Sequence, residues 1–173
     1  MAIRSPVLRT AFRRALRAVA LCVVIPTLAG AQTSANASVT ADVQQPLSVS
    51  KTNDLAFGGV FPGLNKTIAV TDAGAAAFSV QGQANASVNL TFTTPATLAN
   101  GGNSLTIGTW AARRNTTNSS ASGTDFTPSG SATSATLSSG GALYLFVGAT
   151  VQPSSSQAAG TYTGTLTLTV VYF

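Results

Sequence analysis

The sequence contains no histidine and no glutamate, and its one cysteine, Cys22, lies near the N-terminus. Histidine is the commonest side chain that exchanges protons near neutral pH, and histidine and cysteine are the usual ligands of zinc. Serine and threonine are abundant, but a nucleophilic hydroxyl needs an activating base beside it. After residue 31 the only side chains that could act as this base are two lysines and four aspartates, and the aspartates lie far apart in sequence. We therefore predict no catalytic residue, no metal site, no cofactor and no small-molecule substrate, and we do not expect an enzyme.

Charged side chains make up only 8% of the sequence, and the positive ones are concentrated at its start. Five of the nine basic residues are arginines within the first 17 positions. The other four balance the four aspartates, and these eight residues are Lys51, Lys66, Arg113, Arg114, Asp42, Asp54, Asp72 and Asp125. Nucleic-acid binding requires clustered positive charge on one surface, so this neutral segment argues against a nucleic-acid partner.

Long apolar runs are also lacking. The longest, AVALCVVIPTLA at residues 18–29, is too short to span a bilayer well. It follows the arginines and precedes the small residues AGA at 29–31, an order typical of a secretory signal peptide. We predict that residues 1–31 are this signal and that the rest is exported through the inner membrane to the periplasm, the cell surface or the medium. The pair Arg13 and Arg14 leaves both the general and the twin-arginine export routes open.

No helical pattern follows residue 31. Short runs such as SVNLTFT (87–93) and LYLFVGATV (143–151) alternate apolar and polar side chains, with turns such as NGGN (100–103) between them. Many short strands at about ten-residue spacing favour a sandwich or barrel over an α/β fold. We predict an all-β protein, an immunoglobulin-like or pilin-like antiparallel β-sandwich of about eight to nine short strands. It is expected to form a single domain at residues 32–173, with a long polar loop near residues 113–134.

The stretch GTYTGTLTLTVVYF at residues 160–173 has a period of two. Successive side chains of a strand point to opposite faces, so this stretch predicts one strand. We expect its threonines to face outward and its apolar row to face the core; that row is Tyr162, Leu166, Leu168, Val170 and Tyr172. If the strand lies at a sheet edge, its free backbone groups are a template for another chain.

A second alternating row begins the predicted mature chain, at Ala37, Val39, Ala41 and Val43. Such a row suits a donor strand that inserts alternate side chains into the groove of another chain. It also suits the first strand of the domain's own sandwich, continued past Pro46. The residues leave both interpretations open, although alanine buries little apolar area and would be a modest anchor.

Four segments of the sequence resemble the bacterial family called domain of unknown function 4402. Leu55, Phe57 and Gly58 correspond to its L-x-F-G element. The segments are LAFGGVFPG (55–63), AAFSVQGQANASVNLTF (76–92), LYLFVGATV (143–151) and AGTYTGTLTLTVVY (159–172). The resemblance implies an exported, immunoglobulin-like, fimbria-associated domain akin to the spore coat protein U domain.

The last segment is also similar to the end of pilins that a periplasmic chaperone and an outer-membrane usher assemble. As in those subunits, a glycine, Gly160, stands fourteen residues from the end, and a tyrosine, Tyr172, is penultimate. The similarity implies that the last strand borders a groove, which a chaperone strand fills first and a neighbour's N-terminal extension fills later. The implied partners are further copies or other fimbrial subunits, with the chaperone and usher. The pilin disulfide has no counterpart here.

We thus predict a secreted or surface-exposed, non-enzymatic structural protein, a fimbrial or pilus-like subunit whose C-terminal strand takes part in strand-complementation assembly. Two alternatives stay open. A terminal Phe173 after an export signal is typical of small outer-membrane β-barrels, although Thr167 and Thr169 would then form a poor lipid-facing row. A secreted sugar-binding or protein-binding sandwich is the other, because sandwich folds host many functions.

Overall fold

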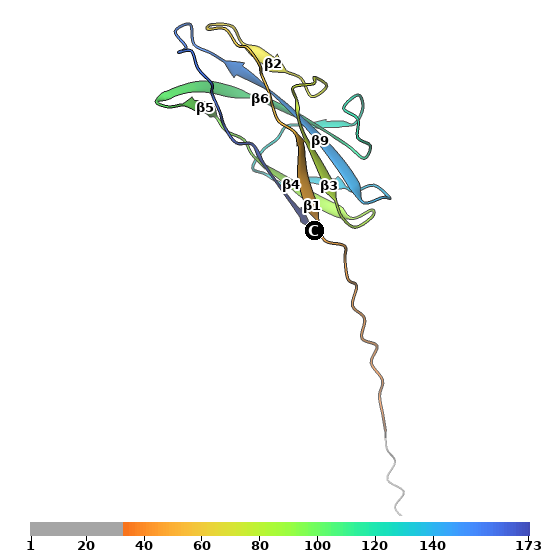
Figure 1. The fold of residues 1–173 in the computed structure, drawn as a ribbon. Helices are drawn as coiled ribbons and strands as arrows, with labels where there is room; N and C mark the ends of the chain where they lie inside the picture. The colour runs from red at the N-terminus through yellow and green to blue at the C-terminus, as the bar shows by residue number, and fades with distance from the viewer. Residues whose placement is uncertain (1–32) are drawn as a thin grey trace, which may run out of the picture. The chain divides into compact units, whose positions relative to one another are not determined.

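The computed structural model describes residues 33–173, so the predicted signal peptide lies outside the described residues. Ala41–Phe173 form one compact unit, which is all-β and antiparallel (Figure 1). Its strands are β1 (Ser48–Asn53), β2 (Lys66–Ile68), β3 (Ala76–Gln81), β4 (Ser87–Thr93), β5 (Thr97–Asn100), β6 (Asn103–Asn115), β7 (Thr124–Phe126), β8 (Thr133–Thr136), β9 (Ala142–Gln152) and β10 (Thr167–Tyr172). The predicted fold class is confirmed. The described part of the chain holds no helix long and apolar enough to cross a membrane.

The strands form two sheets. The larger sheet has the order β1-β3-β9-β6-β5, with β2 beside β9 and β7 beside β6. β6 and β9 are thirteen and eleven residues long, so each has room for two shorter neighbours in line. β2 and β7, of three residues each, are such neighbours. The smaller sheet has the order β10-β4-β8, so β1 and β10 are edge strands of different sheets.

The main core lies between the two sheets. β3, β4 and residues 142–147 of β9 alternate buried side chains with more exposed ones, as burial of one face requires. Val88, Leu90 and Phe92 of the smaller sheet are buried against the larger one. Phe92 meets Phe78 of β3 edge to face, with ring centroids 6.5 Å apart, a geometry that the charge distribution of aromatic rings favours. The predicted sandwich is therefore held together by apolar packing between its sheets.

A second, smaller core lies on the larger sheet beyond the main core. Its buried members are Leu105 and Ile107 of β6 with Ala149 and Val151 of β9. Within the described residues, none from β4, β8 or β10 belongs to this cluster. Half-buried side chains from loops and from β5 and β6 pack against it instead. The larger sheet therefore extends past the area that the smaller sheet covers.

A β-bulge on β6 connects the two cores. Between Gly108 and Ala111 the register with β9 shifts by one residue, and Thr109 has a φ of 48°, which residues with a side chain rarely adopt. The extra residue reverses the alternation of the strand. Before the bulge the odd-numbered Ile107 faces the core, and after it the even-numbered Trp110 does.

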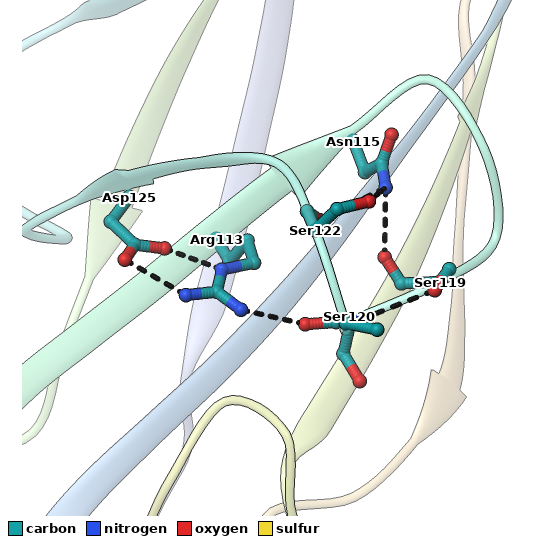
Figure 2. A network of polar contacts seen from close by, with 7 residues as sticks. Arg113, Asn115, Ser119, Ser120, Ser122 and Asp125 are labelled. Atoms are coloured by element: carbon teal, nitrogen blue, oxygen red, sulfur yellow. Dashed lines mark hydrogen bonds and ion pairs between the residues drawn. The ribbon is translucent and has the colours of Figure 1, made fainter.

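Much of the stretch expected as a polar loop near residues 113–134 is ordered. β6 continues through its first three residues, and β7 pairs with β6 within it. The loop between these strands folds back on β6, where Asn115 Nδ2 donates to the carbonyl oxygen of Ser119 at 3.0 Å (Figure 2). Arg113 Nη1 donates to the carbonyl oxygen of Ser120 at 2.8 Å. Side chains of β6 thus hold this polar loop by hydrogen bonds.

Arg113 also forms a bidentate ion pair with Asp125 on β7. Its Nε lies 2.5 Å from one carboxylate oxygen and its Nη2 lies 2.9 Å from the other. The guanidinium hydrogen bonds lower the pKa of the Asp125 carboxyl below its usual value, against a smaller opposing effect of desolvation. The same hydrogen bonds raise the pKa of Arg113. The ion pair therefore links β6 to β7, the two strands that the loop at residues 116–123 connects.

Candidate functional site

An apolar groove lies between the edges of the two sheets. β1 and the loop after it line one side of the groove, and residues 157–166, which lead into β10, line the other side. Within residues 33–173, neither β1 nor β10 has a second strand partner on its groove side. Free backbone groups at a sheet edge can pair with an added strand. Figure 1 shows β1 and the dark-blue β10 converging toward the end marked C.

The floor of the groove consists of core side chains. Its volume is about 890 Å³, and Phe78 of β3, Ile107 of β6 and Val151 of β9 line it. Each of these three side chains is at most 8% exposed. The charged residues at the rim, Lys51 and Asp54, pair with each other at 2.6 Å. The surface therefore matches an extended segment with one apolar row better than it matches a charged ligand.

Beyond the residues that line the groove, Tyr172 joins the two sheet edges at a place that we call the pinned end. Its hydroxyl donates to the carbonyl oxygen of Gln45 at 2.7 Å and accepts the backbone N–H of Gln83 at 2.7 Å. Gln45 precedes β1, so this hydroxyl joins the end of β10 to the chain entering the larger sheet. Gly82 permits the close approach, because a Cβ there would lie 2.5 Å from the Tyr172 hydroxyl and 2.7 Å from Leu47.

The residues before β10 correct the predicted extent of the terminal strand. β10 covers only residues 167–172, so a single strand from Gly160 is wrong. Ahead of it the chain crosses to the larger sheet, where Thr163 exchanges two backbone hydrogen bonds with Ala99 of β5, at 2.8 and 2.9 Å. Tyr162 therefore packs on the second core, away from the other members of the predicted row. Those members, Leu166, Leu168, Val170 and Tyr172, are half-buried against the main core.

Gly160 has a local structural reason to be glycine. Its φ of 148° lies in a region that side chains disfavour. A Cβ there would also collide with the side-chain amide of Asn100 on β5. Gly160 thus lets the chain pass close to β5 before it crosses to the smaller sheet.

The L-x-F-G residues form one wall of the groove. Leu55 packs against both cores and Phe57 against the second one. Gly58 has a φ of 63°, which glycine adopts without strain. Lys66 Nζ donates to the carbonyl oxygen of Gly59 at 3.0 Å and holds the loop against β2. The motif therefore shapes the groove wall.

Ala37, Val39, Ala41 and Val43 lie in no strand, so their interpretation as the sandwich's own first strand is wrong. The first strand begins only at Ser48, which pairs with Gln81 at the end of β3. Residues 41–47 belong to the compact unit but lie in no strand. Val39 and Val43 are 93% and 95% exposed. The segment thus presents an apolar row that this fold does not bury.

Three residues of the groove and the pinned end were not identified from the sequence. Trp110, the one tryptophan of the chain, lines the groove because the bulge redirects it. Gln45 contributes its backbone to the pinned end, and a backbone contact leaves no side-chain signature. Gly82 stands in a glycine-containing turn, QGQAN at 81–85, which was the available signal for a close approach. Among the described residues, no group of three or more His, Cys, Asp or Glu side chains could hold a metal ion.

Comparison with known proteins yields a family and a similar solved structure. Residues 47–172 match the model of a family described as domain of unknown function DUF4402. A chain from a chaperone-usher pilus, in a structure described as revealing the molecular basis of rod uncoiling, is 18% identical with a TM-score of 0.44. That similarity covers 86% of this chain and 100% of the pilus chain. No curated protein matches the sequence.

Proposed function

This chain belongs to the DUF4402 family, as its sequence predicted, and we propose that it is a non-enzymatic structural subunit of a pilus-like assembly. Its groove accepts a β-strand from another chain, and the donor is the segment at residues 33–43 of a second copy. Other fimbrial subunits, a periplasmic chaperone and an outer-membrane usher are the further expected partners. The protein acts after export, in the periplasm or at the cell surface.

One observation carries this proposal: the apolar groove lies beside β1 and the chain that enters β10, two edge strands with no second strand partner among residues 33–173. A strand added beside β10 would extend the smaller sheet from three strands to four. It would also cover the second core, which loops now cover in part. Strand addition of this kind gains affinity from main-chain hydrogen bonds and specificity from alternate side chains.

The donor segment has the chemistry that such a groove requires. Its odd-numbered positions from 35 to 43 are alanine or valine, and its even-numbered positions are polar. Burying Val39 and Val43 would contribute about 1.5–3 kcal/mol each. Each new backbone hydrogen bond would add about 0.5–1.5 kcal/mol net. The main chain is thus expected to contribute at least as much as the side chains, which offsets the small size of the alanines.

Trp110 makes occupancy of the groove measurable. A synthetic peptide of residues 33–45, titrated into the full chain, should shift the Trp110 emission to the blue because the peptide displaces water from the groove. A control peptide carrying Val39→Asp and Val43→Asp should bind at least about tenfold more weakly, because it would bury unpaired carboxylates.

Deletion of residues 33–43 separates the donor from the acceptor. The full chain should form ladders on an unheated gel that collapse to monomer on heating. The deletion variant should stay monomeric yet still bind the 33–45 peptide, because its groove is intact. The proposal fails if the peptide leaves the Trp110 emission unchanged and if protein purified from the cell surface runs only as monomer on an unheated gel.

A further inference from the structure

We propose that subunits stack head to tail through a second contact, in which an exposed apolar loop of one copy packs against the β10 end of the next. The loop comprises Phe61, Pro62 and Leu64, which we call the apolar knob. This inference rests on the proposed strand insertion and adds its direction and the surface that accompanies it.

The apolar knob is ordered and yet exposed. Phe61 is 72% exposed and Leu64 is 63% exposed. The backbone N–H of Gly63 donates to the carbonyl oxygens of Pro153 and Ser154, at 3.2 and 3.0 Å. These bonds fix the loop to the end of β9, so its large apolar side chains are held in water. Exposed apolar surface of this kind marks interaction sites when it forms a patch.

The apolar knob lies at the end of the groove opposite the pinned end. β9 starts beside Gln81, whose neighbour Gly82 lies against the Tyr172 hydroxyl. β9 then runs to Gln152, directly before the Pro153 carbonyl that binds the knob. Eleven residues of strand span about 35 Å. The alternating row at residues 35–43 has nine residues and spans about 30 Å when extended, so a donor can cover most of that distance.

The pinned end determines the direction of the donor. There the Tyr172–Gln45 hydrogen bond crosses the gap between the two edges, so an inserted strand cannot continue through it. The donor's own folded unit follows its C-terminal end, and that end must leave by the knob. The donor therefore starts at the pinned end and runs antiparallel to β10, in keeping with the antiparallel pairing of the smaller sheet.

The connection between the donor and its own folded unit is too short to keep two copies apart. The donor's apolar row ends at Val43, and Gln45 is already bound to its own unit by Tyr172 and Gln83. Only Gln44 remains between them, and one residue spans at most about 3.6 Å. The pinned end of the donor copy must therefore rest against the knob end of the acceptor copy.

The two surfaces that meet are both apolar. Near the pinned end, Val171 and Phe173 are 51% and 68% exposed. At the other end, Phe61 and Leu64 are exposed on the apolar knob. Packing of these two pairs against each other would remove four large apolar side chains from water, which favours association.

Cysteine pairs test the contact directly, because residues 33–173 contain no cysteine. In a Cys22→Ser background, a Phe61→Cys chain mixed with a Phe173→Cys chain should form disulfide-linked dimers under mild oxidation. The control replaces Phe173→Cys with Ser131→Cys. Ser131 is exposed and precedes β8, on the sheet edge opposite β10, so this pair should give only background cross-linking.

A double variant, Phe61→Ser with Leu64→Ser, provides a second measurement. It should weaken association of full chains about tenfold or more, while its binding of the 33–45 peptide stays unchanged. Unchanged association, or equal cross-linking of the Phe61→Cys chain to both partners, overturns the knob contact. If the peptide still blocks association in that case, strand insertion stands. If the peptide neither binds nor blocks association, or if full chains stay monomeric, both proposals fail.

Discussion

The hydroxyl of Tyr172 donates a hydrogen bond to the carbonyl oxygen of Gln45, 127 residues earlier in the chain, at 2.7 Å. It also accepts the backbone N–H of Gln83. One phenol thus ties together the ends of two sheet edges that share no ladder of backbone hydrogen bonds. A residue that resembles a pilin assembly signal in sequence therefore has a structural role inside a single chain.

Loss of this hydroxyl should destabilise the fold. Tyr172→Phe removes two hydrogen bonds and leaves two backbone groups without that partner, so we expect the free energy of unfolding to fall by about 1–3 kcal/mol. Urea unfolding followed by Trp110 emission measures the change. Tyr144→Phe, at a half-exposed position of β9, is the matched control and should shift it by less than about 0.5 kcal/mol. Equal midpoints for Tyr172→Phe and wild type would contradict a structural role for the pinned end.

A methyl group at Gly82 should act on the same contact by crowding it. The Cβ of Gly82→Ala would stand 2.5 Å from the Tyr172 hydroxyl and 2.7 Å from Leu47, so these groups must shift. Overpacking of this kind costs about 1–3 kcal/mol. Gly102→Ala, where a Cβ meets no atom within 4 Å, is the control. The double variant Gly82→Ala with Tyr172→Phe should lose less free energy of unfolding than the sum of the two single losses, because both changes affect one contact. Strictly additive losses would show that the two residues do not share that contact.

Substitution of Gly160 distinguishes a structural glycine from an assembly signal. Gly160→Ala should lower the free energy of unfolding by about 1–3 kcal/mol, because a side chain is strained at a φ of 148° and meets Asn100. Adding Asn100→Ala should restore part of that loss by removing the collision while the backbone strain stays. Thermal unfolding measures both variants. Full stability of Gly160→Ala together with loss of assembly would assign the residue to assembly alone.

The Arg113–Asp125 pair predicts a specific loss of stability in acid. Its hydrogen bonds lower the pKa of Asp125 in the folded state. The contribution is therefore complete above the ordinary aspartate pKa of about 4 and is lost as the pH falls through the lowered folded value. Asp125→Asn should be less stable than wild type near neutral pH, with a difference that vanishes toward strong acid.

Urea midpoints of both proteins across this range measure the effect. Asp54→Asn is the control, because the Lys51–Asp54 pair is more than half exposed at both side chains, and such pairs contribute little. A difference between wild type and Asp125→Asn that stays constant with pH would show that the carboxylate charge plays no part.

Strands with one buried face were predictable from sequence. The run SVNLTFT predicted a strand at residues 87–93, and β4 has those bounds. Its three apolar side chains are all buried, so local alternation carries the whole signal. The terminal stretch has the same period, but its chain changes sheets near Thr163. Both sheets accept alternating side chains, so the pattern alone does not reveal the crossing.

The groove was much less predictable than the strands around it. Phe78, Ile107 and Val151 come from three strands, and each alone has the pattern of an ordinary core residue. They line a groove because no strand of this fold covers their side chains on the groove side. The alternation within one strand does not indicate whether a neighbouring strand covers it. The direction of Trp110 depends on the bulge in β6, where one extra residue reverses the alternation. Tyr172 was identified through its resemblance to pilins, and the backbone groups that it binds were not.

The pairing of β10 with β4 joins segments that lie far apart in the chain. Residues 167–172 follow all the other described strands, yet they form the sheet edge that packs beside Leu90 and Phe92. A chain released from its N-terminus onward keeps that side of the core open until these residues are free. Contacts between such distant segments form slowly and leave apolar surface exposed meanwhile. Until β10 pairs with β4, the apolar side chains of β4 therefore lack the neighbour that covers this side of the core.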